Sequence, residues 1–488
     1  MKQKLSLIGI LCLGLFLRIY FYVGPGYTDD LDYIYTAYHS LTSHGISLSF
    51  LNSTDLNAQR IMSIIPLAVC FKLFGFKESS ASIYDLFCSL GCIFLTYLIA
   101  QKSLGEKTAL LAALLYAVFP LDLFYSTQTG GDIPVAFFLL LGVYLLMTEN
   151  FFSAGAAWGF SVATKENGLL FPLVLLAYLL THKETWGALK RIIPGFLLIA
   201  GTELFIFYIY TGNPFHYLQI YENTQTMMQG TTSLSYLPKY LLSSFDPNFL
   251  SQQGLMGIFP FFVLLYFLIA YRKGKLTQNR ALLFFFLWIL LTAGYLEFGV
   301  MTITFRPILK WIRYWTILIC PLTILTANGI QYIKKPVSTV LAILFILNSL
   351  WIVQGNIYWI RQELRYDKEP YKVLKTLPRK KIYMNEEFLG RLQLYSKGKW
   401  KILPFYPNLP LSNLANSYVL ILPSILKTDR AENLPHYLYH VPKKWKFLGT
   451  LTPPGENLRP MNQVFKLYYV PPNKTTPSIS AKKEASHL

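Results

Sequence analysis

The chain has 488 residues and a formal net charge of +19, with 53% hydrophobic residues and only 14% charged ones. A soluble domain usually carries about 25% charged residues, so this composition argues against a cytosolic enzyme, and the high apolar fraction excludes a disordered chain. Apolar residues dominate up to about residue 355, and the remainder is polar. The composition therefore predicts a multi-pass integral membrane protein with a soluble tail.

Eleven apolar segments approach the ~20 residues that a membrane-spanning helix needs, although several are shorter. They cover roughly residues 5–23, 82–101, 108–121, 133–148, 152–164, 168–181, 192–210, 254–271, 281–296, 312–330 and 336–355. The first is expected to be retained as a span, because no small-residue cleavage site follows it. Residues 1–355 are therefore predicted to form an all-α polytopic membrane domain.

Basic residues between these segments predict the orientation. Four of the loops on one predicted side are rich in Lys and Arg, with Lys102, Lys107, Lys183, Lys190, Arg191, Arg272, Lys273, Lys275, Arg280, Lys334 and Lys335. Such loops face the cytoplasm, which places the N-terminus inside. An odd number of spans then places residues 24–81, residues 211–253 and the tail outside the cell membrane.

The tail from residue 356 contains 22 Lys and Arg residues against 9 Asp and Glu residues, a net charge of +13. Strand-like runs at 381–384 and 418–422 predict a small extracytoplasmic α/β domain over residues 356–470. Residues 471–488 are rich in Pro, Ser, Thr and Lys and are predicted to be disordered. The basic surface faces anionic lipid headgroups or a polyanionic acceptor, or is simply solvated; no nucleic-acid-binding signature is present.

Three carboxylates stand in four positions directly after the first span, at Asp29, Asp30 and Asp32. Adjacent carboxylates repel each other, which raises the pKa of one toward the value that a general base needs. They could also bind a divalent cation. The alternative is a hydrated helix cap, since Thr28 and Asp29 are good capping residues.

The rest of this loop is amphipathic. Residues 60–75 are typical of a helix that lies on the outer leaflet, with Arg60 and Lys72 near the lipid headgroups. There the two cations could meet a lipid phosphate, or they could only extend their charged ends toward water.

Later outer loops add further charged residues. Asp132 begins a predicted span, where a helix N-terminus favours a carboxylate, so capping is its simplest role. Lys165 and Glu166 adjoin each other between two short spans, either as a structural pair or with the lysine bound to a phosphate. Arg306 and Arg313 lie at the outer end of the tenth span, where they break the positive-inside trend and need a local anion.

Collected on one side of one membrane, these carboxylates and cations suit one reaction class. A hydroxyl attacks a carbon whose leaving group is a lipid-linked phosphate, a carboxylate takes the proton, and cations stabilise the departing phosphate. No Walker motif, Rossmann glycine fingerprint or HExxH motif is present. The cell exterior also lacks nucleotide sugars, which favours a lipid-linked donor.

The membrane part resembles the GT-C glycosyltransferases of the family 39 type, which hold protein O-mannosyltransferases and the bacterial lipid A aminoarabinose transferase. The similar segments, over roughly residues 8–335, are Thr28-Asp29-Asp30-Leu31-Asp32-Tyr33 with Ala37, Leu73-Phe74-Gly75, residues 125–134, residues 159–165, Thr211-Gly212-Asn213-Pro214, and Arg313-Tyr314 followed by Pro321 and residues 327–329. Two departures are an aspartate at Asp30, where the family often has glutamate, and a second loop without an arginine before Asp132.

The resemblance implies a GT-C fold and inverting transfer of a sugar from a polyprenyl-phosphate donor. It assigns the catalytic base to Asp29, supported by Asp30, and the binding of the donor phosphate to the cations Arg60, Lys72, Lys165, Arg306 and Arg313. Substrate-binding or supporting roles are expected for Asp32, Tyr33, Asp132, Glu166 and Tyr314. No cofactor is expected to be required, although a divalent cation at Asp29 and Asp30 stays open.

Two other function classes remain at this point. A transporter or flippase for lipid-linked saccharides would carry charges at mid-span, and only Arg18 and Glu203 lie inside predicted spans, with Arg18 near enough to the outer end to reach water. A non-catalytic partner in envelope-glycan assembly would keep the fold. The acceptor, whether a glycolipid, lipid A, a glycan or a protein, is not defined by the sequence, and no nucleic-acid partner is expected.

Overall fold

The computed structural model describes residues 2–26, 28–182, 187–227, 252–298, 312–423, 426, 434–451 and 465–472. The chain divides into two compact units, Met1–Arg361 and Gln362–Leu488. The predicted domain boundaries at residues 355 and 470 remain predictions. Arg306 and the residues from 473 onward lie outside the described residues.

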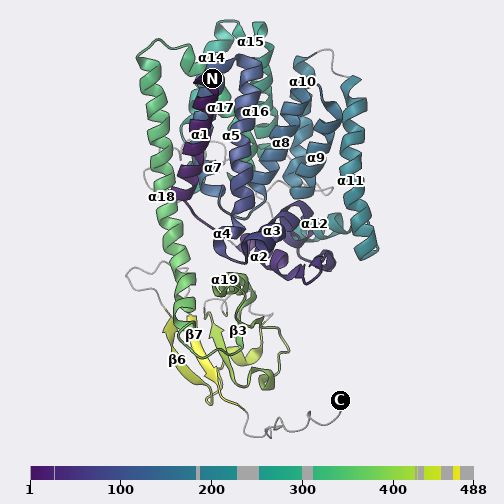
Figure 1. The fold of residues 1–488 in the computed structure, drawn as a ribbon, viewed down its shortest axis with the longest axis vertical. Coiled ribbons are helices and arrows are strands. Elements are labelled where there is room, and N and C mark those ends of the chain that lie inside the picture. The colour runs from purple at the N-terminus through teal and green to yellow at the C-terminus, as the bar shows by residue number, and fades with distance from the viewer. Residues whose placement is uncertain are drawn as a thin grey trace. The chain divides into compact units, whose positions relative to one another are not determined.

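The first unit is a bundle of helices. In chain order they are α1 (Lys2–Tyr20), α2 (Thr28–His39), α3 (Ile61–Phe74), α4 (Glu78–Ala81), α5 (Ile83–Leu104), α6 (Glu106–Ala117), α7 (Pro120–Tyr125), α8 (Asp132–Met147), α9 (Phe151–Thr164), α10 (Phe171–Thr181), α11 (Leu189–Thr211), α12 (His216–Met227), α14 (Phe259–Arg272), α15 (Lys275–Gln278), α16 (Arg280–Phe298), α17 (Ile319–Gln331) and α18 (Val337–Leu374). Figure 1 shows the long helices side by side, with α2, α3, α4 and α12 gathered at one end of the bundle.

Short elements connect these helices. They are the hairpin of β1 (Leu41–Thr42) and β2 (Gly45–Ile46) and the 3₁₀ helices η1 (Ser49–Asn52), η2 (Asn57–Gln59), η3 (Glu166–Leu170), η5 (Gln252–Met256) and η6 (Ile312–Leu318). Two of them, η3 and η6, lie at the starts of the predicted spans 168–181 and 312–330. Both carry charged residues of the site described below.

Each of the eleven predicted spans falls on a helix, so the prediction of an all-α membrane domain is confirmed. Within the described residues, four helices are long and apolar enough to cross a membrane, namely those over Ile83–Leu104, Leu189–Thr211, Arg280–Glu297 and Val337–Tyr358. Five further apolar helices are shorter. The predicted span at 108–121 is broken where α7 begins at Pro120, because proline supplies no backbone N–H to continue the preceding helix. The apolar helices indicate an integral membrane protein.

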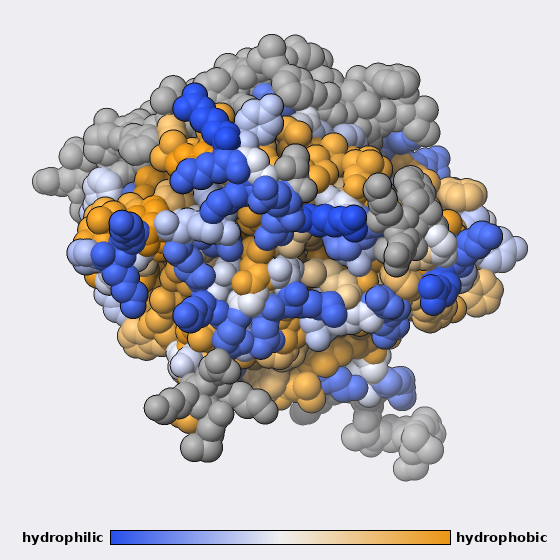
Figure 2. All heavy atoms as spheres, turned by 90° about the horizontal axis from the view of Figure 1, so that it is seen from above, coloured by the Kyte–Doolittle hydropathy of each residue, from blue (hydrophilic) through white to orange (hydrophobic). Residues whose placement is uncertain are grey.

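The surface of this unit also indicates an integral membrane protein. Figure 2 views the end of the bundle where α14 and α15 lie, and hydrophilic residues gather in the middle of that face with hydrophobic residues around them. The elements there carry Arg272 and Lys275, two of the basic loop residues. A polar end cap around an apolar bundle is expected of a protein whose sides face lipid.

The predicted surface helix is present as α3. Its residues Ile61, Ile64, Leu67 and Phe71 are buried and share one face, whereas Leu73 near its end is 70% exposed. The spacing of the buried positions follows the helical repeat, which docks this one face onto the bundle and fixes Arg60 just ahead of its first turn.

Glycines set the spacing of α9 and α11, which pack closely. A Cβ at Gly155 would lie 1.9 Å from the carbonyl oxygen of Ile192, and a Cβ at Gly195 would lie 1.9 Å from that of Phe152. No side chain fits at either position, so the two backbones are in direct contact. This contact holds the first turns of α9, the helix that Lys165 follows, against α11.

Arg18 corrects one expectation. Its side chain does not reach water but is fully buried, where it forms an ion pair with the fully buried Asp122 of α7. It also donates to the carbonyl oxygens of Gly14 and Ala117, at 2.9 and 3.2 Å. A buried charge is stable only when paired and hydrogen-bonded, and these partners meet both conditions.

The second unit contains a five-stranded mixed sheet in the order β4-β3-β5-β7-β6. Its elements are β3 (Ile382–Met384), α19 (Glu386–Ser396), β4 (Ile402–Pro404), η7 (Leu411–Leu414), β5 (Ser417–Ile421), η10 (His436–Leu438), β6 (Lys446–Leu451) and β7 (Phe465–Val470). β3 is parallel to β4 and β5, and β7 is antiparallel to β5 and β6. The two strands predicted at 381–384 and 418–422 are β3 and β5, so the small α/β region is confirmed.

Candidate active site

Five separate elements bring charged side chains together at the end of the bundle that holds α2 and α3. Asp29 lies in the first turn of α2, Asp132 begins α8, Lys165 follows α9, Arg313 lies in η6 and Arg60 precedes α3. The sequence predicted all five as candidate residues, although up to 284 positions separate those in contact.

Four of these residues form a row of alternating charges, which we call the ion-pair row (Asp29, Arg313, Asp132 and Lys165). Arg313 Nη2 donates to Asp29 Oδ2 at 2.7 Å, and Arg313 Nε lies 3.9 Å from Asp132 Oδ2. Lys165 Nζ donates to both carboxylate oxygens of Asp132, at 2.8 and 2.9 Å. Lys165 and Asp132 are only 2% and 3% exposed, whereas Asp29 is 34% exposed. The row therefore runs from a buried pair to a carboxylate that a substrate can reach.

The chain around Asp132 explains its position. Gly131 caps α8 with a φ of +71°, a conformation that favours glycine, and a Cβ there would lie 3.0 Å from Ser63 Oγ. The Asp132 carboxylate binds Lys165 rather than capping its own helix, so its capping role is not the main one.

A second group lies next to this row. Arg60 Nη2 donates to both carboxylate oxygens of Glu166, at 2.9 and 2.8 Å, and Arg60 Nη1 donates to Tyr33 Oη and, at 2.7 Å, to Asn57 Oδ1. Tyr217 of α12 donates to Glu166 Oε2 at 3.1 Å. Arg60 and Glu166 are 5% and 7% exposed. This group ties α2, α3, η3 and α12 together.

The three acidic residues of α2 have different partners. Asp29 accepts from Arg313, Asp30 Oδ2 accepts from the backbone N–H of Gly26 at 2.8 Å, and Asp32 Oδ2 accepts from Asn57 at 3.1 Å. Within the described ranges no group of three or more His, Cys, Asp or Glu residues is arranged to hold a metal ion. Independence from metal stays a prediction.

The surroundings of Asp29 keep it ionised. Burial raises the pKa of the carboxyl, but the charge and hydrogen bond of Arg313, with smaller effects of Lys165 and Arg60, lower it below its ordinary value of 3.8. Burial also lowers the pKa of Lys165, against the effect of Asp132. In the absence of ligand Asp29 is therefore a carboxylate already paired with a cation.

Of the remaining predicted residues, one lies at the ion-pair row, one lies away from it, and one is outside the described residues. Tyr314 adjoins the row, because Lys165 Nζ lies 5.4 Å from the centre of its ring. Lys72 is exposed in the last turn of α3. Twelve residues of helix beyond Arg60 correspond to about 18 Å, so the structure does not bring Lys72 to the row. Arg306 lies outside the described residues.

Two members of the site were missed by sequence reasoning. Asn57 holds Asp32 and Arg60, and Tyr217 holds Glu166. The only local signal was the turn Thr211-Gly212-Asn213-Pro214, which ends α11 shortly before Tyr217. Neither an asparagine in a loop nor a tyrosine in a short helix stands out by residue type.

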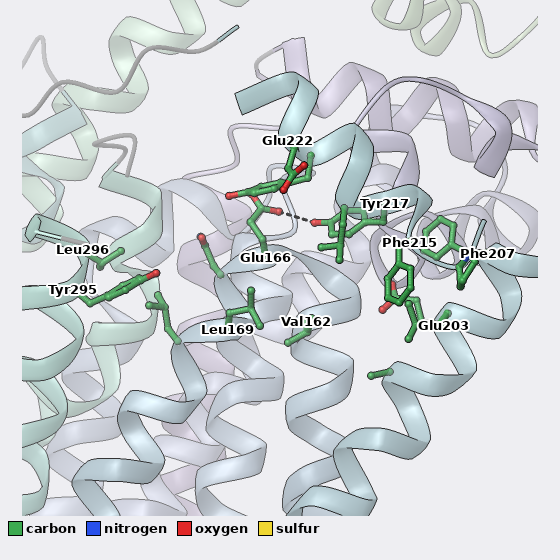
Figure 3. Close-up of a pocket in the computed structure, with 17 residues that line it drawn as sticks. Val162, Glu166, Leu169, Glu203, Phe207, Phe215, Tyr217, Glu222, Tyr295 and Leu296 are labelled. Carbon is green, nitrogen blue, oxygen red and sulfur yellow. Dashed lines mark hydrogen bonds between the residues drawn. The ribbon is translucent and has the colours of Figure 1, made fainter. Parts of the chain in front are cut away.

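A cavity of about 360 Å³ adjoins Glu166. It lies among η3, α9, α11, α12 and α16, and Figure 3 shows Glu166 and Tyr217 joined by their hydrogen bond on its border. Most of its lining is apolar.

The bundle, the small sheet unit and the charged end of the helices together define a membrane protein with the GT-C glycosyltransferase fold. The family model described as dolichyl-phosphate-mannose-protein mannosyltransferase matches residues 61–210. The match begins at α3 and includes Asp132, Lys165 and Glu166. The match agrees with the resemblance seen in the motifs.

Solved structures agree on the fold. The crystal structure of ArnT from Cupriavidus metallidurans bound to undecaprenyl phosphate has a TM-score of 0.64 at 13% identity, and the match covers 95% of this chain and 97% of that one. Its apo form gives a TM-score of 0.63 at 13% identity, with 96% and 98% covered. The arabinofuranosyltransferase AftD from Mycobacteria has a TM-score of 0.52 at 12% identity, with 96% of this chain but 40% of AftD covered.

Among curated proteins, an uncharacterized protein of Aquifex aeolicus (strain VF5) is 25% identical over 242 residues. The match covers 49% of this chain and 58% of that relative, which is less than two thirds of its length. This relative supplies no activity.

Proposed function

We propose that this chain is an inverting glycosyltransferase that moves a sugar from a polyprenyl-phosphate donor to a hydroxyl of an acceptor on the extracytoplasmic face of the membrane. The observation that carries the proposal is the ion-pair row, in which a reachable carboxylate and two cations meet at one end of the bundle. The undecaprenyl phosphate bound by ArnT, which shares this fold, supports the choice of donor.

In the proposed reaction, Asp29 is the base. The acceptor oxygen forms a bond to the anomeric carbon while the bond from that carbon to the phosphate oxygen breaks. The acceptor proton passes to the Asp29 carboxylate, and polyprenyl phosphate leaves with the electron pair of the broken bond. Attack opposite to the leaving group inverts the anomeric centre. Asp29 suits this role because it is ionised and one third exposed.

Arg313 and Lys165 are the proposed ligands of the phosphate. Arg313 is 16% exposed and already near two carboxylates, so an anion at the mouth of the site can exchange for one of them. Lys165 lies deeper and contributes its charge next to the leaving group. The bidentate pair with Glu166 favours a different role for Arg60, which is to position α3 and η3.

Glycan analysis tests the proposal. A strain that lacks the gene is complemented with wild type, with Asp29→Asn, or with the control Glu106→Gln, whose carboxylate accepts from Tyr97 and Gln101 of the neighbouring helix α5. We expect one sugar to be missing from an envelope glycan or lipid of the deletion strain and to return with wild type and Glu106→Gln only, at equal protein abundance. Return of the sugar with Asp29→Asn would refute Asp29 as the base.

A further inference from the structure

The cavity beside Glu166 has a lining that does not match a phosphate. Its walls are mostly apolar, from Leu169, Leu204, Phe207, Phe215 and Leu218 among others. Its size falls in the range of small-molecule sites, about 300–1,000 Å³. Figure 3 shows that the wall is shared between helices, with Glu203 and Phe207 from α11 and Tyr295 and Leu296 from α16.

The polar side chains of this cavity are carboxyl groups, tyrosine hydroxyls and the amide of Asn167. Glu166, Glu203 and Glu222 line it together with three tyrosines, and no Lys, Arg or His is among the described residues of the lining. Arg60 neutralises Glu166. Glu203 differs, because within the described part of the chain no hydrogen bond or ion pair engages its carboxylate. The cavity is therefore largely apolar, and its described polar lining carries carboxyl groups but no cationic side chain.

We propose that this cavity binds an amphiphile whose apolar body packs on the walls and whose head is a hydrogen-bond donor without negative charge, a primary amine or a hydroxyl, held by Glu203. A carboxylate in apolar surroundings is stabilised by such a donor. A phosphate head would find no Lys, Arg or His in the described lining to balance its charge. The donor's phosphate belongs to Lys165 and Arg313, neither of which lines the cavity.

In the proposed transferase, this amphiphile is the acceptor. Glu166 lines the cavity and also contacts Arg60, beside the ion-pair row, so the cavity adjoins the place where the sugar leaves its phosphate. That assignment rests on the proposed function. The binding specificity does not, because it follows from the lining alone.

Native mass spectrometry of the purified full chain in detergent micelles tests the specificity. Dodecylamine, dodecanol and dodecyl phosphate are titrated in separate incubations at neutral pH, so that only the head differs. The variants are Glu203→Gln, which keeps the shape of the side chain and removes its charge, and Leu204→Trp, which fills the cavity. The control for the second is Leu197→Trp, two turns earlier on α11, whose side chain is 56% exposed and does not line the cavity.

We expect wild type to bind dodecylamine at least about tenfold more tightly than dodecyl phosphate, and Glu203→Gln to lose about tenfold in affinity for the amine. Leu204→Trp weakens amine and alcohol alike, and Leu197→Trp does not. Equal or tighter binding of dodecyl phosphate would assign the cavity to the donor and overturn the proposal. Unchanged amine binding in Glu203→Gln or in Leu204→Trp, with each variant monodisperse, would overturn it as well. None of these outcomes depends on turnover, so they are independent of the Asp29 test.

Discussion

The pair of Lys165 and Asp132 allows a structural role to be separated from a functional one. Both side chains are almost fully buried and joined by two hydrogen bonds. Removal of one partner of a buried ion pair costs about 3–5 kcal/mol, because the other charge stays buried without compensation. We therefore expect Lys165→Met and Asp132→Asn each to lower the free energy of unfolding by about that amount. Lys165→Met falls at the lower end, since Arg313 lies 3.9 Å from Asp132 and compensates part of its charge.

The double variant gives the decisive comparison. With both charges removed, neither is left buried alone, so the loss of stability is expected to be smaller than the sum of the two single losses. Binding of the phosphate behaves differently, because a charge-assisted hydrogen bond contributes about 1.5–3 kcal/mol, which corresponds to roughly 10- to 150-fold in affinity. The double variant should regain stability and still bind undecaprenyl phosphate weakly.

The assay has two readouts on the same purified proteins. Denaturant titration in mixed micelles gives the free energy of unfolding, and native mass spectrometry gives the occupancy by undecaprenyl phosphate. If the double variant binds undecaprenyl phosphate as tightly as wild type, Lys165 only supports the fold and its assignment to the phosphate is refuted. If Lys165→Met is destabilised by less than about 1 kcal/mol, the buried pair is not the one described.

Three further predictions concern the neighbouring groups. Arg313→Gln removes the main effect that lowers the pKa of Asp29 while burial still raises it, so the acidic limb of the pH profile of activity should move to higher pH; an unmoved limb would show that Asp29 is not the titrating base. Tyr217→Phe leaves Glu166 with one hydrogen bond fewer and should cost about 1–3 kcal/mol of stability, measured by denaturant titration, and no loss would contradict the described contact. Activity should survive EDTA, and restoration of lost activity by Mg²⁺ or Mn²⁺ would place a cation in the mechanism.

The pKa of Asp29 differs between the folded and the unfolded chain, so the stability of the fold depends on pH. A carboxyl with a lowered pKa in the folded chain adds stability above the unfolded value, and this stability is lost as the pH falls through the lower folded value. The contribution of the pair with Arg313 is therefore present at neutral pH and disappears only below about pH 4.

Much of the fold was predictable because length and apolarity are local properties of the sequence. The helices under the eleven apolar segments and the strands β3 and β5 needed only runs of suitable residues. Arg18 shows where this reasoning ends. Its partner Asp122 is 104 residues away in the buried short helix α7, so an arginine that looked able to reach water is fully buried.

The candidate site was predictable as a set of residues but not as a set of pairs. The motifs contain Asp29, Lys165 and Arg313, yet no local pattern indicates that Arg313 contacts Asp29 across 284 positions. The sequence assigned different roles to Asp29, Asp30 and Asp32 only through the family resemblance, and the fold gives each of them a different partner. Such pairings arise from how the helices pack, which a single sequence does not encode locally.

The position of Arg313 couples the two halves of the proposed reaction. In the ligand-free chain it pairs with the proposed base, and a phosphate at the mouth of the site competes with Asp29 for the same guanidinium. Once the phosphate binds Arg313, only the weaker effects of Lys165 and Arg60 oppose the rise that burial causes in the pKa of Asp29. That pKa therefore rises, and the carboxylate becomes a better base. By linkage, protonation of Asp29 must in turn favour binding of the phosphate. The base is therefore held in a weakly basic state until the donor is bound, which ties deprotonation of the acceptor to the presence of the sugar that it attacks.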